Sequence, residues 1–304
     1  MNIILINSGC GEDYLADLFT TAMLCKSGSK IISNYIPDYL CDTYANASRL
    51  YGRGYTAFCS VPSFLLTTGR VTTDTIDDIV NMISRDRQGK YHVVYTSIWR
   101  FSDEIHRFLG SELRDRCSVI ALDGEDHTMI HPAQKLPITY FKRELDNGSS
   151  SIRPISFRLP VYGLPYLSQG ETYIPEKLQI TAPCDPRYRK SYVYTTQPMY
   201  YRQYSTSLFA VTTKKGGWDC LRHYEILANH CLPYFPGIED KPPSTMADYP
   251  VDLQVESNKL YESLSLSPKV IDDEFCNCYR ILLRDFLTHF YQNFTSIAYT
   301  NILE

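Results

Sequence analysis

The feature that most constrains the fold is an alternation of short apolar runs with amphipathic segments from the N-terminus to Gly124. Continuous apolar runs are typical of strands buried on both faces of a parallel sheet, whereas apolar residues at three- and four-residue spacing predict helices. The predicted strands are Asn2–Asn7, Lys30–Ile36, Tyr91–Ile98 and Cys117–Gly124, and the predicted helices are Tyr14–Cys25, Thr75–Asp86 and Ser102–Leu113. This order predicts an α/β fold with helices on both faces of a parallel sheet.

A second alternating unit follows a break near Asn147–Arg153, where the sequence reads NGSSSIR and then becomes rich in proline and tyrosine. The strand Ser207–Thr213, the helix Trp218–Asn229 and the strand Cys231–Phe235 form a βαβ unit of about the usual length. The apolar stripe of the last predicted helix, Asp272–Phe290, holds Phe275, Tyr279, Leu282, Leu283, Phe286 and Phe290.

A chain of 304 residues suits two domains of ordinary size. We place the boundary near residue 160, with an N-terminal Rossmann-like domain over residues 1–160 and a C-terminal one over residues 161–304. Ligands of such sheets bind beyond the carboxyl ends of the strands, so the cleft between the two domains is the expected site.

Net charge, the length of apolar runs and the spacing of cysteines disfavour several classes of protein. Thirty basic residues against 34 acidic ones give a net charge of −4, whereas general nucleic-acid binders need a basic surplus. No apolar run approaches the ~20 residues that cross a bilayer, and the N-terminal run is expected to be a first strand rather than a signal peptide. The ten cysteines form no CxxC pair. We therefore expect a cytoplasmic protein with free thiols.

The stretch Lys214–Pro236, KKGGWDCLRHYEILANHCLPYFP, gathers charged residues at the start of a predicted helix. Arg222 and Glu225 are three residues apart and lie on one face of its first turns. A glycine pair before the helix permits close backbone approach, and free N–H groups at a helix start favour an anion. With Lys214 and Lys215 nearby, an arginine fork can hold a diphosphate and a glutamate can accept from ribose hydroxyls. The cluster predicts a nucleoside diphosphate site.

A plainer interpretation of the same stretch stays open. Arg222 and Glu225 would then form an ion pair on an exposed helix start, which stabilises by only about 0.2–0.5 kcal/mol.

The run from Thr212 to Met246 resembles the donor-binding segment of a glycosyltransferase family related to the exostosin-like and spore-coat-type enzymes. These enzymes have the GT-B fold of two facing Rossmann-like domains, and the segments LYGRGYTAF, LDGEDHT and YFKREL also look like the N-terminal half of bacterial and viral members. The positions that match the donor pattern are Gly217, Arg222, Glu225, Cys231 and Pro233. The resemblance implies that Arg222 contacts the diphosphate and Glu225 the ribose. The remaining donor-site candidates are Lys214, Lys215, Gly217, Trp218 and Asp219.

Sugar transfer needs a group that takes the proton of the acceptor, unless the leaving phosphate does so. The sequence LDGEDHT supplies Asp123, Glu125, Asp126 and His127 directly after a predicted buried strand. Crowded carboxylates raise at least one pKa, which suits a base, and we favour Asp126, then Asp123, with Glu125 as the third candidate. A polar turn after the strand explains the same residues equally well.

The acceptor side is predicted from LYGRGYTAF, with Tyr51, Arg53 and Tyr55, together with His127. A plain turn remains an equal alternative for the first three. The basic run CDPRYRK, Cys184–Lys190, is more typical of a solvated loop than of a phosphate site.

Other chemistries lack their motifs. The chain has no D-x-D pair for a divalent metal and no P-loop, and Tyr14 stands where a dinucleotide loop needs its third glycine. We therefore expect no cofactor. The predicted activity is metal-independent transfer of a sugar from a UDP- or GDP-type donor to a glycan, protein or other acceptor. The alternative is a non-catalytic nucleotide-binding or scaffold protein of the same architecture.

Overall fold

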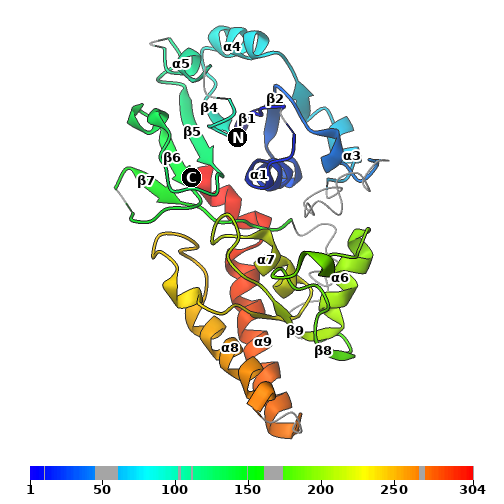
Figure 1. Cartoon of the computed structure of the whole chain (residues 1–304). Helices are drawn as coiled ribbons and strands as arrows, with labels where there is room; N and C mark the ends of the chain where they lie inside the picture. The colour runs from blue at the N-terminus through cyan, green and yellow to red at the C-terminus, as the bar shows by residue number, and fades with distance from the viewer. Residues whose placement is uncertain are drawn as a thin grey trace.

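The computed structural model describes residues 1–9, 11–44, 61–101, 104–110, 112–148, 150–160, 174–266 and 271–303. Within these residues a larger parallel sheet occupies the upper part of Figure 1 and a smaller one lies below it, and helix α9 runs from the bottom of the view up toward the larger sheet. The predicted α/β fold is confirmed.

The larger sheet has seven strands in the described part of the chain, and every neighbouring pair is parallel. The strand order is β3-β2-β1-β4-β5-β6-β7. The bounds are β1 Asn2–Ile6, β2 Lys30–Ser33, β3 Val71–Thr73, β4 Tyr91–Tyr95, β5 Cys117–Asp123, β6 Thr139–Lys142 and β7 Ile152–Pro154. The chain adds strands to one side of β1 and then, from β4 onward, to the other. The switch between β1 and β4 is where ligands bind in open α/β sheets.

Apolar side chains cover both faces of this sheet, which explains the continuous run in β1. Ile3 and Leu5 join the core on the side of α1 (Tyr14–Cys25), while Ile4 and Ile6 join the core beneath α4 (Ile76–Arg85) and α5 (Ile105–Phe108). All four isoleucine and leucine side chains are fully buried. Helix α5 is much shorter than predicted. The short helix α3 spans Phe64–Thr67.

The smaller sheet has the order β10-β9-β8 and is also parallel. Its strands are β8 Gln179–Thr181, β9 Ser207–Val211 and β10 Leu232–Tyr234, joined by α6 Gln197–Ser205 and α7 Leu221–Ala228. The predicted βαβ unit is therefore present as β9-α7-β10. A preceding strand and helix, which the sequence did not predict, extend it to βαβαβ.

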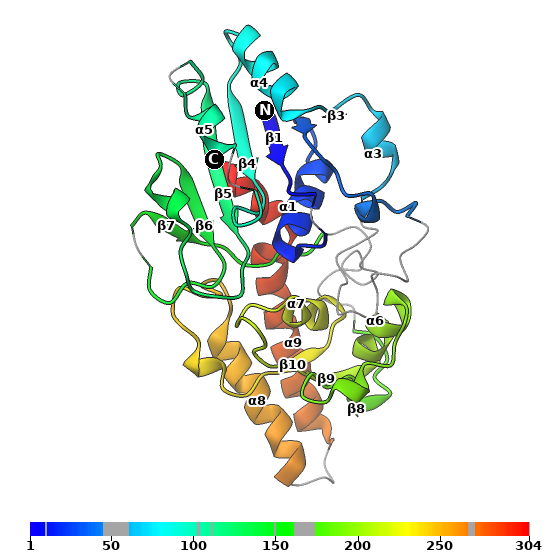
Figure 2. The ribbon, with the colours of Figure 1, turned by 45° about the horizontal axis from the view of Figure 1, so that its top comes forward.

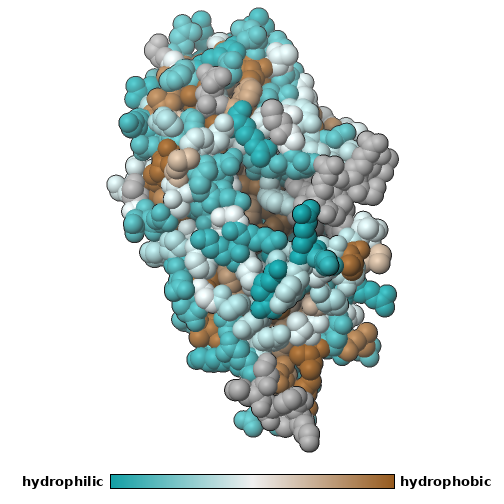
Figure 3. Space-filling model, viewed as in Figure 1, coloured by the Kyte–Doolittle hydropathy of each residue, from teal (hydrophilic) through white to brown (hydrophobic). Residues whose placement is uncertain are grey.

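Two long helices complete the lower part. Helix α8 (Val251–Leu266) packs along β10 and α9, and α9 (Asp273–Asn293) buries Phe275, Tyr279, Leu283, Phe286 and Phe290 from its predicted stripe. The two helices extend away from the sheets in Figure 2, and Figure 3 shows apolar surface near their far end. None of the helices in the described ranges combines the length and apolar content that a bilayer crossing needs.

The end of the chain returns to the larger sheet. The 3-10 helix η6 (Ser296–Leu303) packs on α1, with the rings of Phe19 and Tyr299 5.5 Å apart between centroids. A parallel bridge joins Leu159 and Thr295, where the chain passes between the two parts in both directions. The other 3-10 helices are η1 Asp38–Leu40, η2 Pro132–Lys135, η4 Arg189–Ser191 and η5 Ile238–Asp240.

Candidate functional site

A cavity of about 970 Å³ lies between the two sheets. Its lining comes from segments that follow β1, β4, β5, β6, β7, β8 and β9, so the carboxyl ends of both parallel sheets face the same space. The loops after β1 and β4 both contribute, which places the cavity at the switch point of the larger sheet. This position makes it the candidate functional site.

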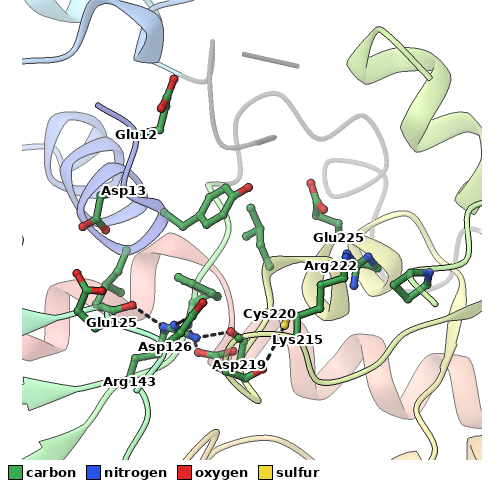
Figure 4. Close-up of a pocket in the computed structure, with 18 of the residues that line it drawn as sticks. Glu12, Asp13, Glu125, Asp126, Arg143, Lys215, Asp219, Cys220, Arg222 and Glu225 are labelled. Atoms are coloured by element: carbon green, nitrogen blue, oxygen red, sulfur yellow. Dashed lines mark hydrogen bonds and ion pairs between the residues drawn. The ribbon is translucent and has the colours of Figure 1, made fainter. Parts of the chain in front are cut away.

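The side of the cavity formed by the second half of the chain is cationic (Figure 4). Lys215 follows β9, Arg222 lies in the first turn of α7, and Arg189 belongs to the loop after β8. Among the described residues, none of these three side chains forms an ion pair. Because a buried or crowded cation is costly without a partner, this wall is suited to an anionic ligand.

Arg222 is the residue that most clearly indicates an anion-binding site. Its Nη2 donates to the hydroxyl of Tyr192 at 2.7 Å, while Nε and Nη1 are buried and have no hydrogen-bond partner among the described residues. The structural alternative, an ion pair between Arg222 and Glu225, is not formed between these two described residues. The amides of Leu221 and Arg222, at the start of α7, donate no hydrogen bond to any residue of the described part. The arrangement fits the predicted role of Arg222 as an anion-binding residue.

Glu225 lines the same cavity one turn further along α7. It is 2% exposed, and its Oε1 accepts a hydrogen bond from the Tyr201 hydroxyl at 2.9 Å. Across the cavity, burial raises the pKa of Tyr14, Glu225 raises it further and Arg222 lowers it. The Tyr14 side chain of α1 is therefore within electrostatic reach of both α7 residues.

The side formed by the first half of the chain is acidic. Figure 4 shows Glu12, Asp13, Glu125 and Asp126 on this side. Asp13 is occupied as the N-cap of α1 and accepts from Ala16 N and the Ser97 hydroxyl, at 3.1 and 2.8 Å. The carboxylates of Glu12 and Glu125 have no hydrogen-bond or ion-pair partner among the described residues.

Two of the three predicted bases are held by other groups. The Asp126 carboxylate is 64% exposed but is ion-paired with Arg143 Nη2. Asp123 is fully buried and accepts from Trp99 Nε1, Tyr140 Oη, Lys142 Nζ and the Glu125 amide. Asp123 does not line the cavity, so its predicted catalytic role is corrected to a structural one, and Glu125 is the best placed of the three.

A buried network from the first half occupies the loop before α7. Glu144 accepts from the amides of Trp218 and Asp219 at 3.0 and 2.9 Å and from Arg143 Nη1 at 2.9 Å. Arg143, 1% exposed, also donates to the carbonyl of Asp219 and lies 4.8 Å from the centroid of Phe157. This clamp fixes the loop between β9 and α7 against the larger sheet.

The glycine pair before α7 serves this clamp. A Cβ added at Gly216 would lie 2.1 Å from Asp126 Oδ2, and one added at Gly217 would lie 2.3 Å from Glu144 Oε1. The glycines were predicted to admit a ligand, but the anions they admit are carboxylates of the protein itself.

Asp219 lines the cavity but is tied into the fold. Its carboxylate accepts from Phe157 N at 3.0 Å and from the Tyr224 hydroxyl at 2.6 Å. Burial raises the pKa of Asp219 to about 6, although the charge of Arg143 lowers it. A donor-binding role for this buried side chain is not favoured.

The remaining predicted site residues lie elsewhere. Lys214 lies 4.9 Å from the ring centroid of Trp218, and neither residue lines the cavity. His127 packs edge-on against Trp99, with centroids 5.1 Å apart, and does not reach the cavity. The acceptor-side candidates Tyr51, Arg53 and Tyr55 lie outside the described residues.

Sequence reasoning missed Glu12, Arg189, Tyr192 and the Arg143–Glu144 clamp. Glu12 follows β1 in the switch-point loop, a position that could have identified it. Arg189 was assigned to a solvated loop. The clamp gives no local signal, because its partners are separated by about seventy-five positions in the chain.

No group of three or more His, Cys, Asp or Glu side chains in the described ranges is arranged to hold a metal ion.

Comparison with known proteins gives little guidance. No family model matches the sequence, and no curated protein matches it. A crystal structure of MurG from Acinetobacter baumannii aligns with 99% of this chain and 98% of that chain, at 10% identity and a TM-score of 0.42. At this identity and TM-score the likeness supports no conclusion about function.

Proposed function

We propose that this chain is a glycosyltransferase that moves a sugar from a UDP- or GDP-type nucleotide sugar to a glycan or protein acceptor without a resident metal ion. Residues 1–160 and 161–304 would form two facing Rossmann-like domains. The observation that carries the proposal is the separation of charge in one cavity. Among the described residues, Arg189, Lys215 and Arg222 on one wall have no ion-pair partner, and neither have Glu12 and Glu125 on the other. The sequence resemblance of Thr212–Met246 to a donor-binding segment supports the same assignment.

On the cationic wall, Arg222 and Lys215 hold the diphosphate, assisted by the free amides at the start of α7. Glu225 accepts from the ribose hydroxyls. As the bond to the sugar breaks, negative charge grows on the leaving diphosphate, and fixed cations placed there stabilise the transition state more than the ground state.

On the acidic wall, Glu125 takes the proton of the acceptor hydroxyl as that oxygen attacks the anomeric carbon. Glu125 suits this role because it is half-buried and holds no ion-pair partner among the described side chains. The rim residue Glu12 orients the acceptor from the opposite edge of this wall.

The test is a thermal-shift screen with UDP-, GDP-, ADP- and CMP-sugars, followed by measurement of released nucleotide with and without acceptor. A true donor raises the Tm in proportion to RT ln(1 + [L]/Kd). Lys215→Ala, Arg222→Ala and Glu225→Ala should each weaken donor binding. Lys214→Ala is the matched control, because its side chain is adjacent in sequence but lies outside the cavity.

Two outcomes would contradict the proposal. Equal donor affinity in the Arg222→Ala and Lys214→Ala proteins would remove the anion site. Tight donor binding with no nucleotide release, under any acceptor tried, would point instead to a non-catalytic nucleotide-binding protein.

A further inference from the structure

The basic loop after β8, residues 184–192, lies outside the β9-α7-β10 unit and contributes Pro186, Arg189 and Tyr192 to the lining of the cavity. Arg189 and Tyr192 line the cavity, whereas the neighbouring Arg187 does not. Arg187 is held by Asp185, with Nη2 2.6 Å from Oδ2. Arg189 has no ion-pair partner among the described residues. In this loop Arg187 therefore has a structural role, whereas Arg189 is available to bind a ligand.

The loop is closed on itself, which fixes where Arg189 and Tyr192 lie. The Ser191 hydroxyl accepts from the Asp185 amide at 2.9 Å and lies 2.7 Å from the carbonyl oxygens of Asp185 and Tyr188. The amide of Ser191 also donates to the Tyr188 carbonyl at 2.9 Å. Residues held by such bonds need less ordering when a ligand binds.

Tyr192 organises the two cations of the second half. Its hydroxyl accepts from Arg222 Nη2 at 2.7 Å. Lys215 Nζ lies 5.0 Å and Arg222 Cζ 5.8 Å from its ring centroid, within the range of cation–π attraction. Burial and the nearby Arg222 charge lower the pKa of Lys215, as expected for two cations held close together. An anion between them relieves that repulsion.

We propose that this loop determines the charge of the ligand: Arg189 contacts the second phosphate of a diphosphate, and Tyr192 is the positioning residue that holds Arg222 against the first. The inference rests on the proposed function for the identity of the full ligand, a nucleotide diphosphate sugar. A single phosphate would be held by Arg222 and Lys215 and leave Arg189 without a partner. The cavity therefore selects diphosphate over monophosphate ligands.

The test uses inorganic pyrophosphate and inorganic phosphate as probes in isothermal titration calorimetry, with the wild type, Arg189→Ala, Tyr192→Phe, Arg222→Ala and the control Arg187→Ala. A charge-assisted hydrogen bond corresponds to roughly a tenfold change in affinity or more. We expect Arg189→Ala to lose about tenfold for pyrophosphate and less than about twofold for phosphate. Tyr192→Phe should weaken the binding of both probes and leave the preference for pyrophosphate unchanged, because Tyr192 acts through Arg222. Arg187→Ala should match the wild type.

Equal wild-type affinity for the two probes, or the same effect from Arg189→Ala and Arg187→Ala, would overturn the inference. Absence of pyrophosphate binding to the wild type would also overturn it. If pyrophosphate binding needs Arg222 but not Arg189, the inference fails while the proposed function stands. If selectivity follows Arg189 but no nucleotide sugar is turned over, the inference stands and the proposed function fails. Arg189 is exposed, so its substitution should leave the fold intact, and the Tm of each variant verifies this.

Discussion

Removing the Glu144 carboxylate should destabilise the protein far more than removing a surface carboxylate. Glu144→Ala deletes three accepted hydrogen bonds, from the amides of Trp218 and Asp219 and from Arg143 Nη1, all within 3.0 Å. The Glu144 and Arg143 side chains are 3% and 1% exposed, so water cannot replace those bonds. Breaking a buried ion pair costs about 3–5 kcal/mol. Arg143 keeps its bond to Asp126, so we expect the lower part of that range.

The assay is urea unfolding followed by circular dichroism, with Glu104→Ala as the matched control. Glu104 pairs with Arg107 at 3.0 Å, but their side chains are 36% and 35% exposed, and such pairs contribute about 1 kcal/mol or less. With m-values of roughly 1–3 kcal/mol per molar urea, the Glu144→Ala midpoint should fall by at least ~1 M and the Glu104→Ala midpoint by much less. Similar losses in the two variants would refute the reasoning that this network clamps the two sheets.

Four further predictions concern the site and its buried ionisable groups. Glu125→Gln should lower the rate of sugar transfer about 10²–10⁴-fold at nearly unchanged stability, whereas the main effect of Asp123→Asn should be a loss of stability. Activity and Tm assays that show the reverse pattern would contradict the assignment of Glu125 as the base. Gly217→Ala places a carbon against a buried carboxylate and should cost about 1–3 kcal/mol in urea unfolding; a neutral result would show that the loop can shift. Burial lowers the pKa of His223 to about 3, so stability present above pH ~6.5 should fall by about 2 kcal/mol on going to pH 5, because only the unfolded state gains the proton. Asp219, with its pKa raised to about 6, has the opposite sign, because its stabilising contribution is lost as pH rises through 6, so it offsets part of that loss. Asp219→Asn should therefore lose about 1–1.5 kcal/mol more than the wild type between pH 7 and 5, and equal slopes in pH-dependent unfolding would refute the assignment.

The sequence predicted elements whose signal is local. Strand β1 and helix α1 appear close to their predicted bounds, because an apolar run and an Asp13 cap act within a few residues. Helix α5 was overpredicted, since only Ile105–Phe108 is helical before the chain turns at Gly110. Helix α8 gave no clear stripe, and its buried polar residues, such as Gln254, bond to the β10 carbonyl of Pro233 instead. A helix held by polar contacts with a neighbouring strand cannot be recognised from apolar periodicity.

The same distinction between local and distant signals applies to the site. Arg222 and Glu225 were predicted as site residues because both lie on one helix that follows a strand, and both line one cavity with Glu125. Asp123 was misjudged because its donors, among them Trp99 in the loop after β4 and Lys142 in β6, come from neighbouring parts of the sheet that no local pattern reveals. Polar residues that follow a predicted strand can be placed at the edge of the sheet from the sequence. Which of their carboxylates lacks a hydrogen-bond or ion-pair partner depends on residues that only the folded chain brings close.

The glycine pair before α7 shows what this dependence means for the ligand. Gly216 and Gly217 were expected to admit a phosphate, yet Asp126 and Glu144 lie against them, and Glu144 takes the amides of Trp218 and Asp219. A second anion at those amides would meet two carboxylates and be repelled. Leu221 and Arg222, one step further along, line the cavity, and their amides have no acceptor in the described part. Any phosphate must therefore bind at the first turn of α7 and not at the glycine loop. Phosphate binding that survives Arg222→Ala but is lost in Gly217→Ala would place the anion at the loop and contradict this argument.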